Sequence, residues 1–126
     1  MKAGNRKTIL FLEDEEELLM TVGALLRDQG YNVVMVKRAE DASVILQREP
    51  PDLILADIKL PGIDGFDFFK EVQKDESLKK IPFVFLTAFN NMNASVYAKQ
   101  HGAAEYITKP FEFEYLIARI RDLVPP

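Results

Sequence analysis

Five side chains that could bind a metal ion or move a phosphoryl group come directly after short apolar runs. They are Glu13, Asp14, Asp57, Thr87 and Lys109. Crowded carboxylates repel one another and need a cation or a proton, and oxygen ligands without histidine or cysteine indicate Mg²⁺ or a similar ion. A lysine ammonium and a threonine hydroxyl suit the oxygens of a bound anion. The set is typical of a site that transfers a phosphoryl group, with Asp57 as the nucleophile.

The apolar runs before these residues indicate strands that are buried on both faces. Three of the runs show no alternation of apolar and polar side chains, which is typical of the interior of a parallel sheet. The apolar pattern that predicts the two further strands is weaker. The five expected strands are residues 9–12, 31–36, 53–56, 83–86 and 106–108.

Apolar residues at helical spacing follow each expected strand. Asp64 is the expected N-cap of the third helix, and Gly30 and Gly102 are expected just beyond the ends of the first and fourth. The strand–helix unit repeats five times, which predicts an α/β fold with parallel strands and helices on both faces. Because parallel strands end at one edge of a sheet, the five functional side chains should meet there.

The order of elements shows no internal domain boundary. We therefore expect a single domain over residues 1–126 with its core at about 7–123. A basic N-terminal tail is expected at residues 1–6. Residues 124–126 end in two prolines and resemble the start of a linker.

Composition excludes several classes of function. The net charge of −4 argues against direct nucleic-acid binding by this domain, because no basic excess is present to neutralise phosphates. Cysteine is absent, which excludes disulfides and thiolate metal sites and suits the cytoplasm, the expected location. The apolar runs are too short to cross a bilayer, and no membrane partner is expected.

Four segments of the chain resemble the receiver domain of two-component response regulators. The resemblance extends from about Lys7 to Leu123, and its segments occur in the order that the family has. They are residues 12–15 (LEDE), 52–65 (DLILADIKLPGIDG), 86–88 (LTA) and 102–111 (GAAEYITKPF). The resemblance implies a flavodoxin-like, doubly wound fold, with a five-stranded parallel sheet of order 2-1-3-4-5 and five helices on both faces.

The same resemblance assigns roles at the site. It implies that Asp57 accepts a phosphoryl group from a histidine kinase or a phosphotransfer protein. Mg²⁺ would be bound by Asp14, Asp57 and the backbone carbonyl of Lys59, with Glu13 assisting. Thr87 and Lys109 would contact the phosphoryl oxygens.

The resemblance also implies a switch. Tyr106 would move inward when Thr87 moves, and the Lys109–Pro110 bond would be cis, as only X-Pro bonds readily are. The signal would leave through the fourth helix, the fifth strand and the fifth helix, toward an output domain, another partner or a second copy of the chain. Arg119 and Tyr115 are expected to be exposed there.

Three positions depart from the usual pattern of the family. Glu13 stands where aspartate is more usual. Lys59 and Phe89 follow two residues after Asp57 and Thr87, at positions that vary in the family and border the phosphoryl group. Lys59 cannot accept a hydrogen bond from water and Phe89 is apolar, so we expect a long-lived phosphorylated state.

Other functions fit the sequence less well. A receiver would catalyse only its own phosphorylation and dephosphorylation, so it is mainly a regulatory domain. A receiver-like interaction domain that takes no phosphate is one alternative. A phosphatase with an aspartate nucleophile would need an acid where Lys59 stands. A flavin or nucleotide module would need a loop rich in glycine, serine or threonine after the first strand, which is acidic here.

Overall fold

The computed structural model describes residues 6–126, so the expected basic tail lies outside the described residues except for Arg6. Five strands alternate with five helices along the chain. The strands are β1 (Thr8–Leu12), β2 (Asn32–Val36), β3 (Leu53–Ala56), β4 (Phe83–Thr87) and β5 (Glu105–Thr108). The helices are α1 (Glu16–Asp28), α2 (Ala39–Arg48), α3 (Gly65–Lys74), α4 (Met92–Gln100) and α5 (Phe113–Leu123).

The strands form one parallel sheet of order β2-β1-β3-β4-β5, which confirms the predicted fold. Its register decides which side chains become neighbours beyond the strand ends. Leu12 pairs with Ala56, so Glu13 and Asp57 follow side by side. Thr87 pairs with Thr108, so Lys109 begins directly beside the end of β4.

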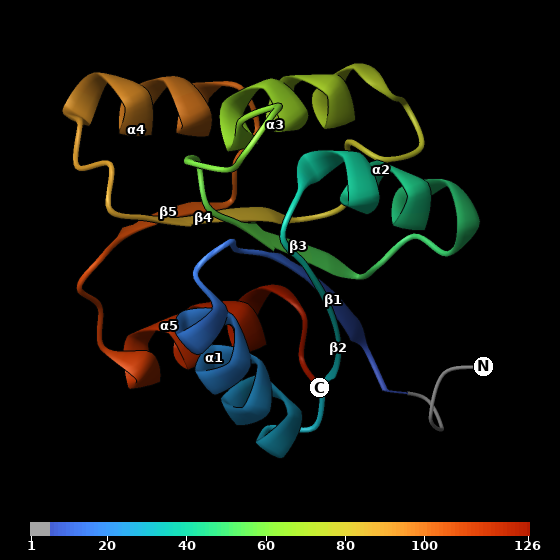
Figure 1. Ribbon diagram of the computed structural model, residues 1–126, viewed down its shortest axis with the longest axis vertical. Helices are drawn as coiled ribbons and strands as arrows, with labels where there is room; N and C mark the ends of the chain where they lie inside the picture. The colour runs from blue at the N-terminus through green and yellow to red at the C-terminus, as the bar shows by residue number, and fades with distance from the viewer. Residues whose placement is uncertain (1–5) are drawn as a thin grey trace.

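Helices cover both faces of the sheet. Figure 1 shows α2, α3 and α4 on one face and α1 and α5 on the other. Strand residues alternate between the two cores: Leu10 and Leu12 pack on the side of α2 and α3, whereas Ile9 and Phe11 pack on the side of α1 and α5. Both faces of β1 are therefore buried, which explains why residues 9–12 are continuously apolar.

Helix ends follow the local chemistry of the sequence. The Asp64 carboxylate accepts a hydrogen bond of 2.8 Å from the Asp67 N–H and caps α3 as predicted. Gly30 has a φ of +103° just after α1, a conformation that glycine adopts without steric cost. Asn91 is the N-cap of α4, and its side-chain oxygen accepts a hydrogen bond of 3.0 Å from the Ala94 N–H.

The packed region extends slightly beyond the predicted core. Val124, expected to begin a linker, is buried against the α1–α5 side. Its carbonyl oxygen accepts a hydrogen bond of 2.6 Å from the buried Tyr31 hydroxyl. No helix among residues 6–126 has both the length and the apolar character that a membrane crossing requires.

Candidate functional site

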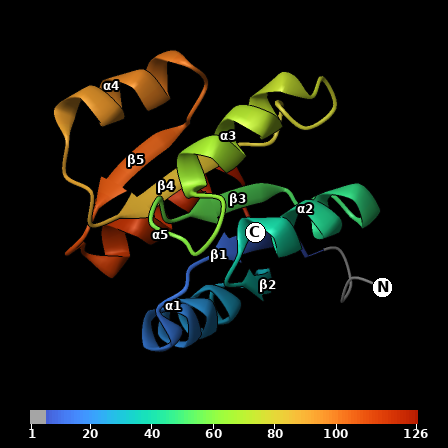
Figure 2. The same ribbon diagram turned by 45° about the horizontal axis from the view of Figure 1, so that its top comes forward.

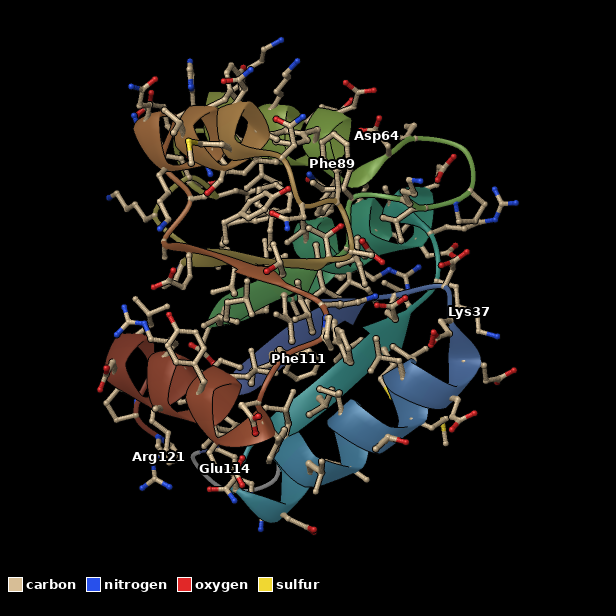
Figure 3. All side chains as sticks on the ribbon, turned by 90° about the vertical axis from the view of Figure 1, so that its left-hand side faces the viewer. Lys37, Asp64, Phe89, Phe111, Glu114 and Arg121 are labelled. Carbon is tan, nitrogen blue, oxygen red and sulfur yellow. The ribbon has the colours of Figure 1, made fainter. Side chains whose placement is uncertain are left out.

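The carboxyl ends of the strands form the edge that carries the predicted site. In Figure 2 the chain leaves β4 and β5 at this edge toward α4 and α5, and Figure 3 looks onto the edge itself. Backbone hydrogen bonds continue the sheet past the strand ends, from the Asp57 N–H to the Leu12 carbonyl at 3.0 Å and from the Lys109 N–H to the Thr87 carbonyl at 2.8 Å. The site is therefore built on the rigid sheet.

Asp57 lies directly after β3 with only 7% of its surface exposed. Its Oδ1 accepts a hydrogen bond of 2.6 Å from the Ile58 N–H and a longer contact of 3.4 Å from the Lys59 N–H. Its Oδ2 accepts from the Lys109 ammonium at 3.0 Å. Both carboxylate oxygens are thus oriented before any ligand arrives.

Lys109 joins two carboxylates across the site. Its Nζ lies 2.8 Å from Glu13 Oε1 and 3.0 Å from Asp57 Oδ2. Burial disfavours the ammonium, but hydrogen bonds to Glu13 and Asp57 and their charges outweigh burial, so the pKa of Lys109 lies above its ordinary value. The Lys109–Pro110 bond is cis, as expected.

Glu13 is almost entirely enclosed, with 1% of its surface exposed. Burial raises the pKa of Glu13 above its ordinary value, and the charge of Asp57 adds to this; the Lys109 ammonium and the Glu15 N–H act in the opposite direction. Glu13 Oε2 accepts a hydrogen bond of 3.1 Å from the Glu15 N–H, just before α1. Glu13 therefore connects Lys109 to the start of α1.

Within residues 6–126, Asp14 takes no part in these ion pairs. Its side chain is exposed and lines an open pocket of about 540 Å³, together with Ile58, Lys59, Leu60, Pro61, Asp64 and Phe89. Figure 3 shows Asp64 and Phe89 close together on this side of the edge. The sequence predicted that Glu13, Asp14 and Asp57 would crowd at one point. In residues 6–126, however, no three acidic or histidine side chains lie close enough together to hold a metal ion.

The residues around the pocket still suit a magnesium ion. Asp14 and Lys59 line one solvent-open cavity, and Lys59 follows Asp57 by two residues in the sequence. Carboxylate and carbonyl oxygens, completed by water, are the donors that Mg²⁺ prefers. The donor set therefore fits Mg²⁺, with Asp14 as the most accessible carboxylate.

The loop after β4 links three of the predicted residues through its backbone. The Phe89 N–H donates to the buried Thr87 Oγ1 at 3.1 Å, and the Phe89 carbonyl accepts from the Tyr106 hydroxyl at 2.6 Å. Burial, followed by the charge of Asp57, raises the pKa of Tyr106. Sequence reasoning placed Phe89 beside the site for its side chain and missed this backbone role, which no side-chain pattern indicates.

Lys59 and Phe89 both border the open pocket. The Phe89 side chain is 39% exposed. The Lys59 side chain is exposed and has no ion pair with any other residue in the range 6–126. The structure thus places two of the three departures from the family pattern, Lys59 and Phe89, on the same open pocket.

Gly65 is a supporting residue that sequence reasoning treated only as the start of α3. Its N–H donates to the Ile58 carbonyl at 2.7 Å, and a Cβ at this position would overlap the carbonyl oxygen of Asp57. The glycine directly after the expected N-cap Asp64 is the sequence feature that could have indicated this role. Glycine lets the start of α3 approach the Asp57 backbone closely.

On the predicted output face, Arg119 differs from expectation. It was expected to be exposed, but it is partly buried, and its guanidinium donates to Glu105 at 2.9 Å and to Asp122 at 2.9 Å. Tyr115 is half exposed, as expected, and Met92 is 80% exposed at the start of α4. The accessible contacts of this face are therefore more apolar than predicted.

Comparison with known proteins decides the family. The response regulator receiver domain matches residues 9–121. The chain belongs to this family. Receiver domains are the phospho-acceptor switches of two-component systems, they bind Mg²⁺ at the phosphorylation site, and they act with histidine kinases or phosphotransfer proteins and with output domains.

Individual relatives support the assignment of the receiver domain. The chain is 30% identical over 112 residues to the protein PilH of Pseudomonas aeruginosa, covering 89% of this chain and 93% of PilH. It is 33% identical over 115 residues to the phosphate regulon transcriptional regulatory protein PhoB of the same organism, covering 91% of this chain and 50% of PhoB. The chain thus spans about half the length of several curated relatives.

Solved structures agree with the receiver fold. A putative response regulator from Chloroflexus aurantiacus superimposes with a TM-score of 0.89 at 30% identity, covering 97% of this chain and all of that one. The BeF3-activated receiver domain of Klebsiella pneumoniae RstA superimposes with a TM-score of 0.85 at 32% identity, covering 93% of this chain and 98% of that one.

Proposed function

We propose that Asp57 is the residue of this receiver domain that takes the phosphoryl group. One observation carries the proposal: a carboxylate at the end of a buried strand is held by a lysine ammonium at 3.0 Å, and the two residues that follow it line an open pocket together with Asp14. A phosphohistidine of a histidine kinase or a phosphotransfer protein is the proposed donor.

The residues around Asp57 have separate tasks in the transfer. A carboxylate oxygen of Asp57 attacks phosphorus, the P–N bond of the phosphohistidine breaks, and the imidazole leaves with the electron pair and takes up a proton. The Ile58 N–H fixes the orientation of the carboxylate, and the Lys109 ammonium stabilises the negative charge near the reacting oxygen. Mg²⁺, held by Asp14, Asp57 and the Lys59 carbonyl, would neutralise charge on the phosphoryl oxygens.

The switch is proposed to run through the loop after β4. The Thr87 hydroxyl can donate a hydrogen bond to a phosphoryl oxygen. Its oxygen accepts a hydrogen bond from the Phe89 N–H, so a movement of Thr87 would pull on Phe89. The Phe89 carbonyl in turn accepts a hydrogen bond from the Tyr106 hydroxyl. Thr87 and Tyr106 would therefore move together and bias the α4–β5–α5 face between two arrangements. An output domain, another partner or a second copy would bind there, in the cytoplasm.

Phosphorylation by a small donor tests this function. The protein is incubated with acetyl phosphate and Mg²⁺, and its intact mass is measured. We expect one phosphate-sized increment in the wild type, none in Asp57→Asn, and none in the wild type with EDTA. A wild type that stays unlabelled, with its fold intact, would instead favour the interaction domain that takes no phosphate.

A further inference from the structure

A cavity of about 240 Å³ lies between α3 and α4. Figures 1 and 2 show these two helices side by side on one face of the sheet. The cavity is lined from the C-terminal half of α3 and the end of α4, by Phe69, Lys70, Gln73, Lys74, Tyr97 and His101. Asp57 instead lies against Gly65, the first residue of α3. The cavity is therefore separate from the site described above.

The residues around this cavity carry positive charge, although the net charge of the protein is −4. Lys70 and Lys74 lie one helical turn apart on α3, and neither forms an ion pair with another residue of the range 6–126. No aspartate or glutamate is among the described residues that line the cavity. Like charges at this spacing on a helix repel each other. An anion held between the two ammoniums would relieve that repulsion.

The ends of the two helices explain only part of this charge. Lys74 is the last residue of α3 and His101 follows α4 directly, so both can offset the partial negative charge of a helix end. Lys70 lies one turn earlier, where the effect of the helix end has faded. Its ammonium lies 5.6 Å from the centre of the Tyr97 ring, across the cavity. Helix stabilisation therefore does not account for Lys70.

Gln73 adds a hydrogen-bond donor that has no acceptor. Its side chain extends from α3 to the turn after α4, where a Cβ on Gly102 would lie 2.8 Å from Gln73 Oε1. The Gln73 Nε2 is buried, and no residue of the range 6–126 accepts a hydrogen bond from it. A buried donor without an acceptor is unfavourable. An acceptor oxygen bound in the cavity would remove this cost.

Aromatic side chains give the cavity an apolar wall. The Tyr97 and His101 rings stack, with 3.9 Å between their centroids and 20° between their planes. His101 Nδ1 lies 2.8 Å from the Tyr97 carbonyl oxygen, and this contact orients the imidazole. Phe69 is fully buried at the cavity. The rings would contact the apolar part of a ligand, and the volume, below the usual range for drug-sized molecules, requires that ligand to be small.

We propose that the cavity between α3 and α4 binds a small organic anion. Its carboxylate or phosphate group would lie between Lys70 and Lys74 and accept a hydrogen bond from Gln73, while its apolar part contacts Tyr97. Carboxylate and phosphate share the required chemistry, a negative charge with several acceptor oxygens, and a lysine ammonium acts as a point charge toward either. The proposal does not depend on the role of Asp57.

Two model anions test the proposal on the full chain. Benzoate carries a carboxylate, phenyl phosphate carries a phosphate, and benzamide is a neutral control close in size to benzoate. Each is titrated into nitrogen-15-labelled protein, and the signals of the Gln73 side-chain amide and of His101, the single histidine of the chain, are followed. We expect saturable shifts of both signals with at least one anion and none with benzamide; the tighter anion identifies the group. No shift with either anion, or equal shifts with benzamide, would overturn the proposal.

Two double variants of equal net charge show whether these two lysines are responsible. Lys70→Gln with Lys74→Gln removes the ammoniums of the cavity and should weaken anion binding about tenfold. Lys79→Gln with Lys80→Gln removes two exposed ammoniums outside the cavity and should stay within about threefold of the wild type. Equal losses in both variants would show unspecific attraction and would overturn the proposal.

Gln73→Met tests the unpaired donor, because methionine is similar in length and cannot donate. It should weaken anion binding without lowering the melting temperature of the free protein, since the variant loses a buried donor that had no acceptor. A merely structural role of Gln73 would give the opposite pattern, a lower melting temperature with unchanged anion binding, and would contradict the proposed contact.

Discussion

At the scale of single residues, the site is a set of charges that do not fully cancel. One ammonium, Lys109, is shared by Glu13 and Asp57. Asp14 adds a further carboxylate on the neighbouring pocket. The remaining negative charge explains why a divalent cation would assist the arrival of an anionic phosphoryl group.

The lifetime of the phosphorylated state should depend on Lys59 and Phe89. Hydrolysis needs a water held opposite the Asp57 oxygen, and neither side chain can accept a hydrogen bond from that water. We expect Lys59→Asn with Phe89→Glu to speed decay roughly ten- to a hundred-fold, since a positioning contact contributes about 1–3 kcal/mol. Decay of the phosphorylated protein is followed after donor removal, with Lys70→Asn on α3 as a control. Equal or slower decay in the double variant would show that these side chains do not control the water.

Gly65 should tolerate no side chain. A methyl group in Gly65→Ala would overlap the Asp57 carbonyl oxygen, which belongs to a strand end that cannot move freely. We expect a loss of at least about 1–3 kcal/mol in the free energy of unfolding. Gly23→Ala in α1 is the matched control: its methyl would meet only the flexible Met35 side chain, and alanine favours the helix. Urea unfolding measures both, and similar losses would refute the close-approach argument.

At the scale of elements, one loop connects the site to the α4–β5–α5 face. Phe89 contacts Thr87 through its N–H and Tyr106 through its carbonyl. The Tyr106 ring also packs against Phe85 in β4, at 5.7 Å between ring centroids. We propose that a change at Thr87 reaches β5 through these contacts of Phe89 and Tyr106.

Amide exchange should map this connection. With a beryllofluoride mimic of the phosphoryl group, we expect altered exchange in the β4–α4 loop, α4, β5 and α5. Tyr106→Phe loses the hydrogen bond to Phe89. Without the mimic, the amides of the β4–α4 loop should exchange faster in this variant, and adding the mimic should change their exchange less than in the wild type. The lost hydrogen bond should lower the free energy of unfolding by about 1 kcal/mol. Tyr115→Phe, on the same face but half exposed, is the control. Changes confined to α1 and α2 would exclude this route.

At the scale of the whole molecule, the two cores share the sheet and depend on a few buried polar groups. The Tyr31 hydroxyl ties the start of β2 to Val124, the residue after α5. Lys109 ties the loop after β5 to the ends of β1 and β3. Both links join segments far apart in sequence, so their protonation affects the folded chain as a whole.

Stability should therefore fall at alkaline pH. Burial raises the pKa of Tyr31 and Tyr106, and the pKa of Lys109 is also raised because its hydrogen bonds to acids outweigh burial. A group whose pKa is higher in the folded state contributes fully below its unfolded pKa, about 10 for these groups, and loses that contribution as the pH rises through the folded value. Urea unfolding between neutral pH and about pH 11 should show this decline.

Tyr31→Phe isolates one part of the decline. It should lower the free energy of unfolding by about 1–2 kcal/mol at neutral pH, because the Val124 carbonyl loses its hydrogen-bond donor. It should also make the fall in stability at alkaline pH less steep. Tyr115→Phe should change neither quantity appreciably. An unchanged alkaline slope in Tyr31→Phe would mean that Tyr31 does not contribute to it.

The sequence allowed the sheet order, the edge that holds the site and the Asp64 cap to be predicted, because they follow from apolar runs, local capping chemistry and a family resemblance. Pairings across long separations could not be predicted in the same way. Glu13 and Lys109 were placed at one edge, but only the sheet register reveals that they bind each other and leave Asp14 apart. The Arg119–Glu105 pair and the burial of Val124 likewise depend on how α5 packs.

The chemical location of the phosphoryl group tests the central claim most directly. Borohydride reduces an acyl phosphate to an alcohol, so a phosphorylated aspartate becomes homoserine. The protein is labelled with acetyl phosphate and Mg²⁺, reduced, digested and analysed by peptide mass spectrometry. We predict homoserine at position 57, with Asp14, Asp52 and Asp64 unchanged. Homoserine at another aspartate, with Asp57 intact, would contradict the account.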